Sequence, residues 1–99
     1  MNFDFPKKED FYPTTIEMAA RSFYEDLVEE DKRVLKEIGN KNGNAMNHIW
    51  FQTEVQRAIR NKFGLWTGNQ ELLNATGKEH PDDASGVIFD RMVNLAKED

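Results

Sequence analysis

Apolar residues recur three and four positions apart along most of this chain, which is the spacing of helices with one buried side. Five segments show this pattern, and residues that commonly begin or end helices separate them. In chain order, the expected helices span about 15–28, 29–39, about 45–62, 70–76 and 81 to about 97. We therefore predict an all-α fold, a compact single domain of five helices without a sheet.

Short polar residues and glycines mark the expected helix ends. Thr14 and Glu17 have the capping-box spacing, so Thr14 is expected to cap the first helix. Asn44 is expected to cap the third helix, and Thr67 or Asn69 the fourth. Glycine, which commonly ends a helix in a left-handed conformation, follows three of the apolar runs. These glycines are Gly39, Gly64 and Gly77.

The third expected helix is apolar on two sides. One side carries Met46, Ile49 and Trp50, and four apolar residues occupy another side: Phe51, Val55, Ala58 and Ile59. A helix that is apolar on more than one side is buried more than most, so we place this helix at the centre of the fold. Gly86, inside the last helix, predicts a close crossing with the third helix or with the loop around Trp66.

The first thirteen residues carry four aromatic side chains and two prolines, which disfavour a helix. We expect residues 1–13 to form an extended strap on the core and residues 14–99 to form the helical domain. Exposed aromatic clusters are uncommon, and this favours the strap. The alternative is a contact arm for a partner or for a second copy of the chain.

Composition excludes several classes of protein. The net charge of −5 argues against non-specific binding of nucleic acids. The chain has no cysteine, which excludes disulfides and thiolate chemistry. No apolar run approaches the roughly 18 residues of a membrane span, and the first residues do not have the pattern of a signal peptide. We therefore expect a cytoplasmic protein that does not bind membranes.

The most conspicuous polar cluster is His80, Asp82 and Asp83 around Pro81. A metal site is disfavoured because a zinc ion needs three or four convergent ligands and the other histidine, His48, is far upstream. His80 and Asp83 could instead form an acid–base pair across the first helical turn. We favour a structural role, because proline suits the first helical position and aspartates suit the positive end of the helix dipole.

Signatures of catalysis are weak elsewhere. Ser85 has His80 and aspartates nearby, but a G-x-S-x-G elbow is absent because Asp83 stands at the position of the first glycine. Neither of the common glycine-rich phosphate loops occurs. We expect no catalytic residues, no metal and no cofactor, and we rank an enzyme third among the functional classes.

Three polar residues of the third helix form a further candidate site. Arg57, Arg60 and Asn61 lie three and four positions apart and could hold an anion such as a nucleotide phosphate. We favour a different role, in which Arg60 forms an ion pair with Asp82 or Asp83 and so locks the last helix to the third.

Trp66 directly follows a helix end and is expected to fold back over the core as a buried residue. Its alternative role is a platform on which a base stacks. The full set of candidate ligand- or partner-binding residues is Arg57, Arg60, Asn61, Trp66, Asn69, His80, Asp82 and Asp83.

The stretch from residue 59 to residue 85 also carries a resemblance. It reads IRNKFGLWTGNQELL, followed by GKEHPDDAS from residue 77. The chain resembles a small bacterial domain of unknown function with the pattern IRNxFGLWxGNxxLL…GxxHPDDAS, closely over about its last 45 residues and more loosely upstream. The resemblance implies a compact helical domain and no established activity.

Two functional hypotheses follow. The first is a non-catalytic interaction domain, an adaptor or inhibitor that binds another protein; small acidic proteins of phage–bacterium conflict offer an analogy. The second is a binder of a nucleotide-like anion that uses Arg57, Arg60, Asn61 and Trp66. The chain is expected to be a monomer.

Overall fold

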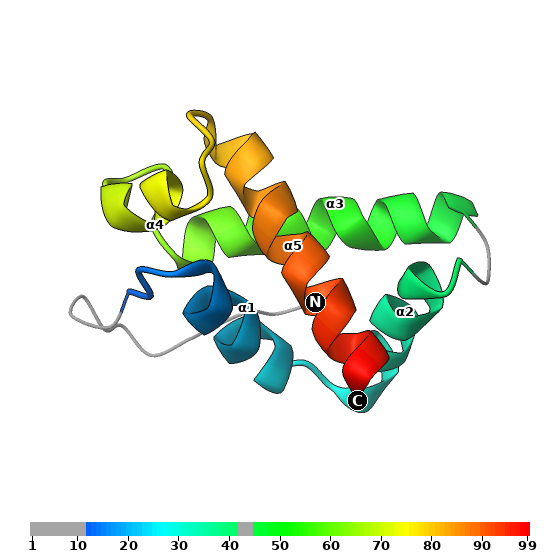
Figure 1. Cartoon of the computed structure of the whole chain (residues 1–99). Coiled ribbons are helices and arrows are strands. Elements are labelled where there is room, and N and C mark those ends of the chain that lie inside the picture. Colours follow the sequence, from blue (N-terminus) through cyan, green and yellow to red (C-terminus); the bar gives the residue numbers. More distant parts are fainter. Residues whose placement is uncertain (1–11, 42–44) are drawn as a thin grey trace.

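The computed structural model describes residues 12–41 and 45–99, with side chains from residue 48 onward in the second range. Within these residues the chain forms helices and no strand, which confirms the predicted all-α fold (Figure 1). The helices are α1 (Ile16–Glu25), α2 (Glu29–Gly39), α3 (Ala45–Lys62), α4 (Gln70–Ala75) and α5 (Pro81–Glu98). The expected cap at Asn44 and residues 1–11 of the expected strap lie outside the described residues.

The cap of α1 differs from the prediction by one residue. Thr15, in an extended conformation, accepts a hydrogen bond on its hydroxyl from the backbone N–H of Met18 at 3.1 Å. The capping box between Thr14 and Glu17 does not form, because the carboxylate of Glu17 binds arginines instead. The helix also ends at Glu25, three residues earlier than expected.

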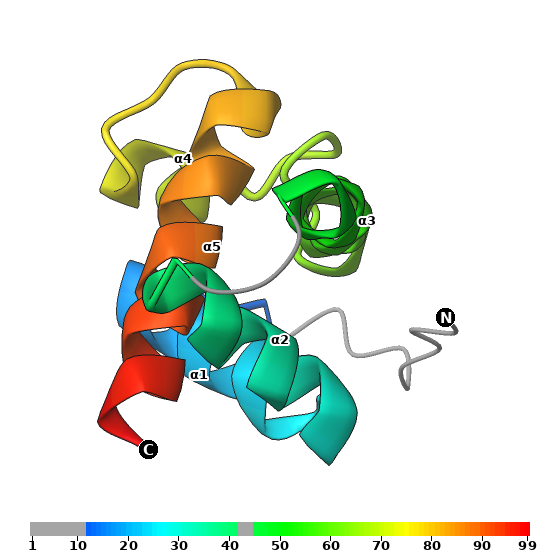
Figure 2. The ribbon, with the colours of Figure 1, turned by 90° about the vertical axis from the view of Figure 1, so that its right-hand side faces the viewer.

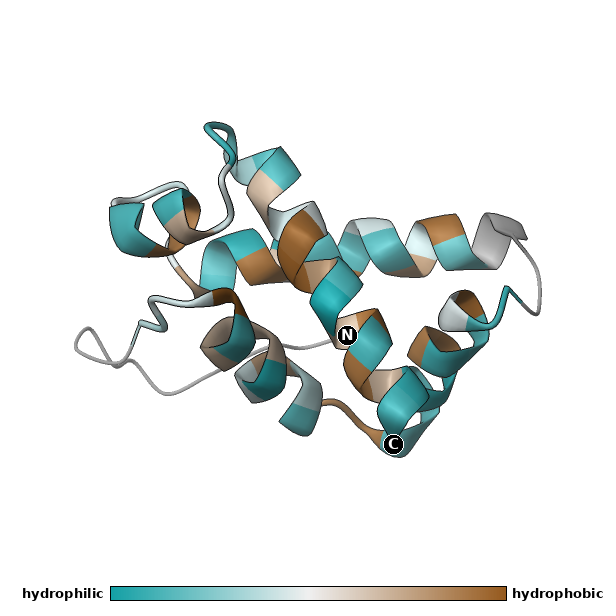
Figure 3. Ribbon diagram, viewed as in Figure 1, coloured by the Kyte–Doolittle hydropathy of each residue, from teal (hydrophilic) through white to brown (hydrophobic). Residues whose placement is uncertain are grey.

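The last helix, α5, is the centre of the fold. Helices α1, α2 and α3 each pack against it, and α4 lies where α3 ends and α5 begins (Figures 1 and 2). Seven of its residues are buried: Ala84, Ser85, Ile88, Phe89, Met92, Leu95 and Ala96. Brown and teal segments alternate along it in Figure 3, as expected of a helix with a buried side and an exposed side.

The prediction that α3 is central is therefore wrong. Val55 and Ile59 are fully buried, whereas Ile49 and Trp50 are 59% and 65% exposed. An apolar pattern on two sides of a helix does not tell which of the sides meets the core. In this fold one side of α3 packs against α5, and Ile49 and Trp50 lie on another side that is exposed.

Two glycines lie at contacts around α3. Gly86 faces α3 as predicted, but a Cβ atom added to it would lie 3.7 Å from the side-chain nitrogen of Gln56, an ordinary contact distance, so this crossing does not require glycine. At the end of α3, Gly64 adopts a φ of 68°, and the ring of Tyr12 packs against it. A side chain at this position would meet the ring at 2.9 Å, so the first described residues lie against the end of α3.

Outside the core, an ion-pair network joins α1 to α5. The guanidinium of Arg91 donates two hydrogen bonds to the carboxylate of Glu17, at 2.7 and 3.2 Å. Arg21, one turn along α1, also binds this carboxylate, and Glu98 lies 3.6 Å from Arg91. The hydrogen bond from Arg91, more than any other interaction, lowers the pKa of Glu17 to about 2.

This lowered pKa predicts how stability depends on pH. The unfolded chain should release the Glu17 proton near pH 4.3, so the folded state is stabilised by this group above that pH. The contribution should disappear as the pH falls through about 2. Glu17→Gln should therefore flatten the fall in the free energy of unfolding between about pH 5 and pH 2, as measured by urea titration at each pH.

The matched control is Glu79→Gln, in the exposed loop before α5. The free energy of unfolding of this variant should fall with decreasing pH as steeply as that of the wild type. An unchanged profile for Glu17→Gln would show that the network does not stabilise the fold.

Candidate functional site

Three parts of the chain meet at one end of the molecule: the last turns of α3, the connection to α4, and the start of α5 (Figure 1). They bring together four of the candidate residues, which are Arg60, Trp66, His80 and Asp82. We call these four residues the Trp66 corner. Local interactions at each of the three parts hold the side chains in place.

The connection after α3 turns Trp66 outward. The left-handed Gly64 reverses the chain, and the N–H of Leu65 bonds to the carbonyl of Arg60 at 3.1 Å. Leu65 is then 4% exposed, whereas Trp66 is 54% exposed. The predicted burial of Trp66 is wrong, because this turn directs only one of two neighbouring apolar side chains inward and Leu65 occupies that place.

The imidazole ring of His80 packs against the indole ring of Trp66. The two rings meet edge to face, with centroids 5.5 Å apart and an angle of 86° between their planes. His80 is also the N-cap of α5, since its Nδ1 accepts a hydrogen bond from the backbone N–H of Asp82 at 3.1 Å. The imidazole is thus held by the helix start, and it packs against a tryptophan that is 54% exposed.

Arg60 ties α3 to the start of α5. Its Nη1 lies 3.2 Å from the carboxylate of Asp82 and donates to the hydroxyl of Ser85, also at 3.2 Å. The side chain of Arg60 is 17% exposed. The predicted ion pair between Arg60 and one of the aspartates is present, with Asp82 as the partner. His80 lies 3.7 Å from the carboxylate of Asp82, whereas the alternative considered from the sequence was an acid–base pair with Asp83.

Because Arg60 and Asp82 are in contact, changes at the two residues should not be additive. Arg60→Ala should lower the free energy of unfolding by about 1–2 kcal/mol, because the packing of the buried aliphatic part of the side chain is lost together with the ion pair. Asp82→Asn should lower it by about 0.5–1 kcal/mol. The double variant should cost less than the two singles together by about 0.5–1 kcal/mol. Thermal or urea unfolding of the four proteins gives this coupling energy.

Asp83→Asn, made with and without Arg60→Ala, is the control, and its coupling energy should be close to zero. Coupling of Arg60 to Asp83 instead of Asp82 would contradict the observed pairing.

Asn69 holds the turn between α3 and α4 in place through side-chain hydrogen bonds. It is 8% exposed, and its amide donates to the carbonyls of Pro13 and Phe63 at 3.0 and 2.8 Å. Its side-chain oxygen accepts from the N–H of Leu72 at 3.4 Å, which confirms Asn69 as the cap of α4. All three contacts lie within the protein, so Asn69 holds the turn instead of facing a ligand.

The other candidates of α3 do not join the corner. Arg57 is 60% exposed and lies 3.5 Å from Glu54, one turn back on the same helix. Asn61 is exposed, and Arg60 is directed to α5. The three residues of the candidate anion site therefore have different surroundings, and the ion-pair role favoured for Arg60 is the one observed. Ser85 is fully buried, and its hydroxyl donates to the carbonyl of Asp82 at 2.8 Å, so it is part of the helix start.

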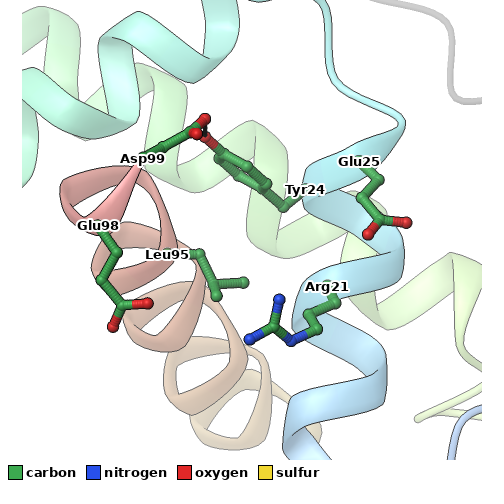
Figure 4. A pocket seen from close by; sticks show the side chains of 6 residues that line it. All are labelled: Arg21, Tyr24, Glu25, Leu95, Glu98 and Asp99. Carbon is green, nitrogen blue, oxygen red and sulfur yellow. Dashed lines mark hydrogen bonds between the residues drawn. The ribbon is translucent and has the colours of Figure 1, made fainter.

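A shallow pocket of about 230 Å³ lies at the opposite end of α5, between that end and α1 (Figure 4). Burial and a 2.7 Å hydrogen bond to Asp99 raise the pKa of Tyr24 there to about 12. The lining residues are Arg21, Tyr24, Glu25, Leu95, Glu98 and Asp99. Sequence reasoning missed this pocket, because its residues form two groups, one on α1 and one at the end of the chain, that lie at least 70 positions apart and share no motif.

Two further kinds of site are absent from the described part of the chain. No three histidine, aspartate or glutamate side chains gather there in a way that could hold a metal ion. None of the helices found there is both long and apolar enough to cross a membrane.

Comparison with known families matches residues 12–94 to a domain of unknown function, DUF6794. Comparisons with curated proteins and with solved structures found no match. The matched range runs from the first described residue to the last turns of α5 and contains the whole Trp66 corner. The chain therefore belongs to the DUF6794 family.

Proposed function

We propose that this domain is a non-catalytic binding module that recognises another protein through the Trp66 corner. The observation that carries this proposal is a tryptophan that is 54% exposed and held edge-on against His80. Tryptophan is enriched among the few residues that supply most of the energy of protein interfaces. A ring already held in one position loses little conformational entropy when a partner covers it.

The charges beside the ring indicate what kind of partner fits. Glu79, Asp82 and Asp83 flank His80 and Pro81 in the chain, and all three are exposed. Arg60 offsets part of the charge of Asp82. A protein with an apolar pocket for the indole and basic side chains around that pocket would match this surface. Inhibition of a phage or bacterial target would be one consequence of such binding.

A nucleotide-like ligand is the second candidate, because an exposed indole can stack on a base. Two observations make it the weaker one. Arg60 is bound to Asp82 and Ser85, and Arg57 lies beside Glu54. The carboxylates next to Trp66 would also repel a phosphate.

Trp66→Ala provides the test. Because more than half of the side chain is exposed, its removal should lower the free energy of unfolding by no more than about 1 kcal/mol. Removal of an interface hot spot should weaken partner binding by about 30-fold or more. Proteins captured from a bacterial lysate by the wild type and by the variant are compared, and the protein that depends on Trp66 is purified and titrated by calorimetry.

Met18→Ala is the matched control, since Met18 is 51% exposed on α1. It should bind the purified partner like the wild type, and the affinity of the wild type should fall with added salt because the rim is charged. Identical capture by the wild type and Trp66→Ala would reject the proposed surface. A thermal shift with nucleotides that Trp66→Ala abolishes would assign the corner to a small ligand.

A further inference from the structure

A second exposed surface lies on α3, on the side that faces away from α5. In Figure 2 this helix is seen nearly end-on at the right, with α4 and α5 to its left and α1 and α2 below it. Trp50, Thr53 and Arg57, spaced three and four apart, are all exposed and share the uncovered side. Trp50 is 65% exposed, and Ile49 beside it is 59% exposed. We call this surface the outer face of α3.

We propose that the outer face of α3 binds the same face of a second copy, with the two helices antiparallel. A two-fold axis that passes between Thr53 and Glu54 places position 50 of one helix opposite position 57 of the other. Each Trp50 then lies against Arg57 of the partner subunit, and symmetry forms this contact twice. A dimer departs from the monomer expected from the sequence.

The chemistry of Arg57 suits this contact. Its Nη1 lies 3.5 Å from the carboxylate of Glu54, and the side chain is 60% exposed. An ion pair of this kind uses the edge of the planar guanidinium, and the face stays available to stack on an aromatic ring. The arginine can therefore keep Glu54 and cover an indole at the same time.

Thr53, at the middle of the face, can be covered at little cost. Its hydroxyl donates to the carbonyl of Ile49 at 2.8 Å, within the same helix. This group therefore loses no hydrogen bond when a second helix excludes water from the face. A single helix pair forms a small interface, so we expect a weak dimer whose population rises with protein concentration.

Sedimentation equilibrium over a wide concentration series tests the dimer. The wild type should show a reversible monomer–dimer equilibrium. Loss of two cation–π contacts should weaken the dimer by about five- to thirtyfold in Arg57→Ala, and at least as much in Trp50→Ala. Both residues are exposed, so the variants should keep the helical content and melting behaviour of the wild type.

A residue swap tests the antiparallel register. Trp50→Arg alone places two arginines together and should weaken the dimer. Adding Arg57→Trp to this variant restores a tryptophan opposite an arginine and should return the dimer constant to within about threefold of the wild type. A double variant that stays as weak as Trp50→Arg would overturn the register.

Trp66→Phe leaves Trp50 as the single tryptophan and should not change dimerisation, which keeps this test separate from the Trp66 corner. In this background the Trp50 emission should shift to the blue as the concentration rises. A monomer at every concentration overturns the dimer. If the protein is a monomer, blue-shifted emission of Trp50 would show that another part of the same chain covers the outer face of α3. Red-shifted emission would show that the face is exposed to solvent and available to a different partner.

Discussion

Replacing Phe89 with alanine is expected to lower the free energy of unfolding by about 3–5 kcal/mol, the usual cost of truncating a large core residue. Phe89 is 1% exposed and lies on α5, the helix against which α1, α2 and α3 pack. Truncation would leave a cavity that the surrounding helices can close only by shifting together. Urea unfolding of the wild type and the variant, extrapolated to water, measures the loss.

Ile49→Ala on α3 is the informative comparison. Ile49 is 59% exposed, so its truncation should change the free energy of unfolding by no more than about 0.5 kcal/mol. The two variants together test whether α5 or α3 is the central helix. Equal losses would contradict the central position of α5.

Asn69→Leu is expected to lower the free energy of unfolding by about 2–4 kcal/mol. Leucine has a similar size but removes three hydrogen bonds, and each buried polar group left without a partner costs about 1–3 kcal/mol. The affected groups are the carbonyls of Pro13 and Phe63 and the N–H of Leu72. These groups join the first described residues, the end of α3 and the start of α4, so a lower melting temperature should accompany the loss.

Asn69→Asp separates the donor from the acceptor. Aspartate keeps an oxygen for the N–H of Leu72 but places a carboxylate against two carbonyl oxygens. At neutral pH it should be at least as destabilising as Asn69→Leu. Asn74→Ala, exposed on the same helix, is the control and should stay within about 0.5 kcal/mol of the wild type. Wild-type stability in Asn69→Asp would show that the amide donor does not matter.

The number and type of the elements could be predicted from the sequence, because their signals are local. An apolar spacing of three and four extends over one segment, and a cap or a helix-ending glycine acts within one turn. The left-handed Gly64 was predicted for this reason, and so was a cap of α4 at Thr67 or Asn69, of which the structure shows Asn69. An ion pair of Arg60 with Asp82 or Asp83 was also predicted, since a polar helix end next to an acidic helix start offers few other partners, and the structure selects Asp82.

What only the tertiary structure decided is which apolar side chains face the core and which distant groups meet. Leu65 and Trp66 are neighbours with similar hydrophobicity, and the turn at Gly64 buries the first and exposes the second. Trp50 is exposed because α3 is apolar on two sides but packs against α5 with the other one. The pairing of Glu17 with Arg91 joins residues 74 positions apart. Hydrogen bonds within a helix depend on residues close in sequence, whereas burial and long-range ion pairs depend on how whole surfaces pack, and no short segment contains that information.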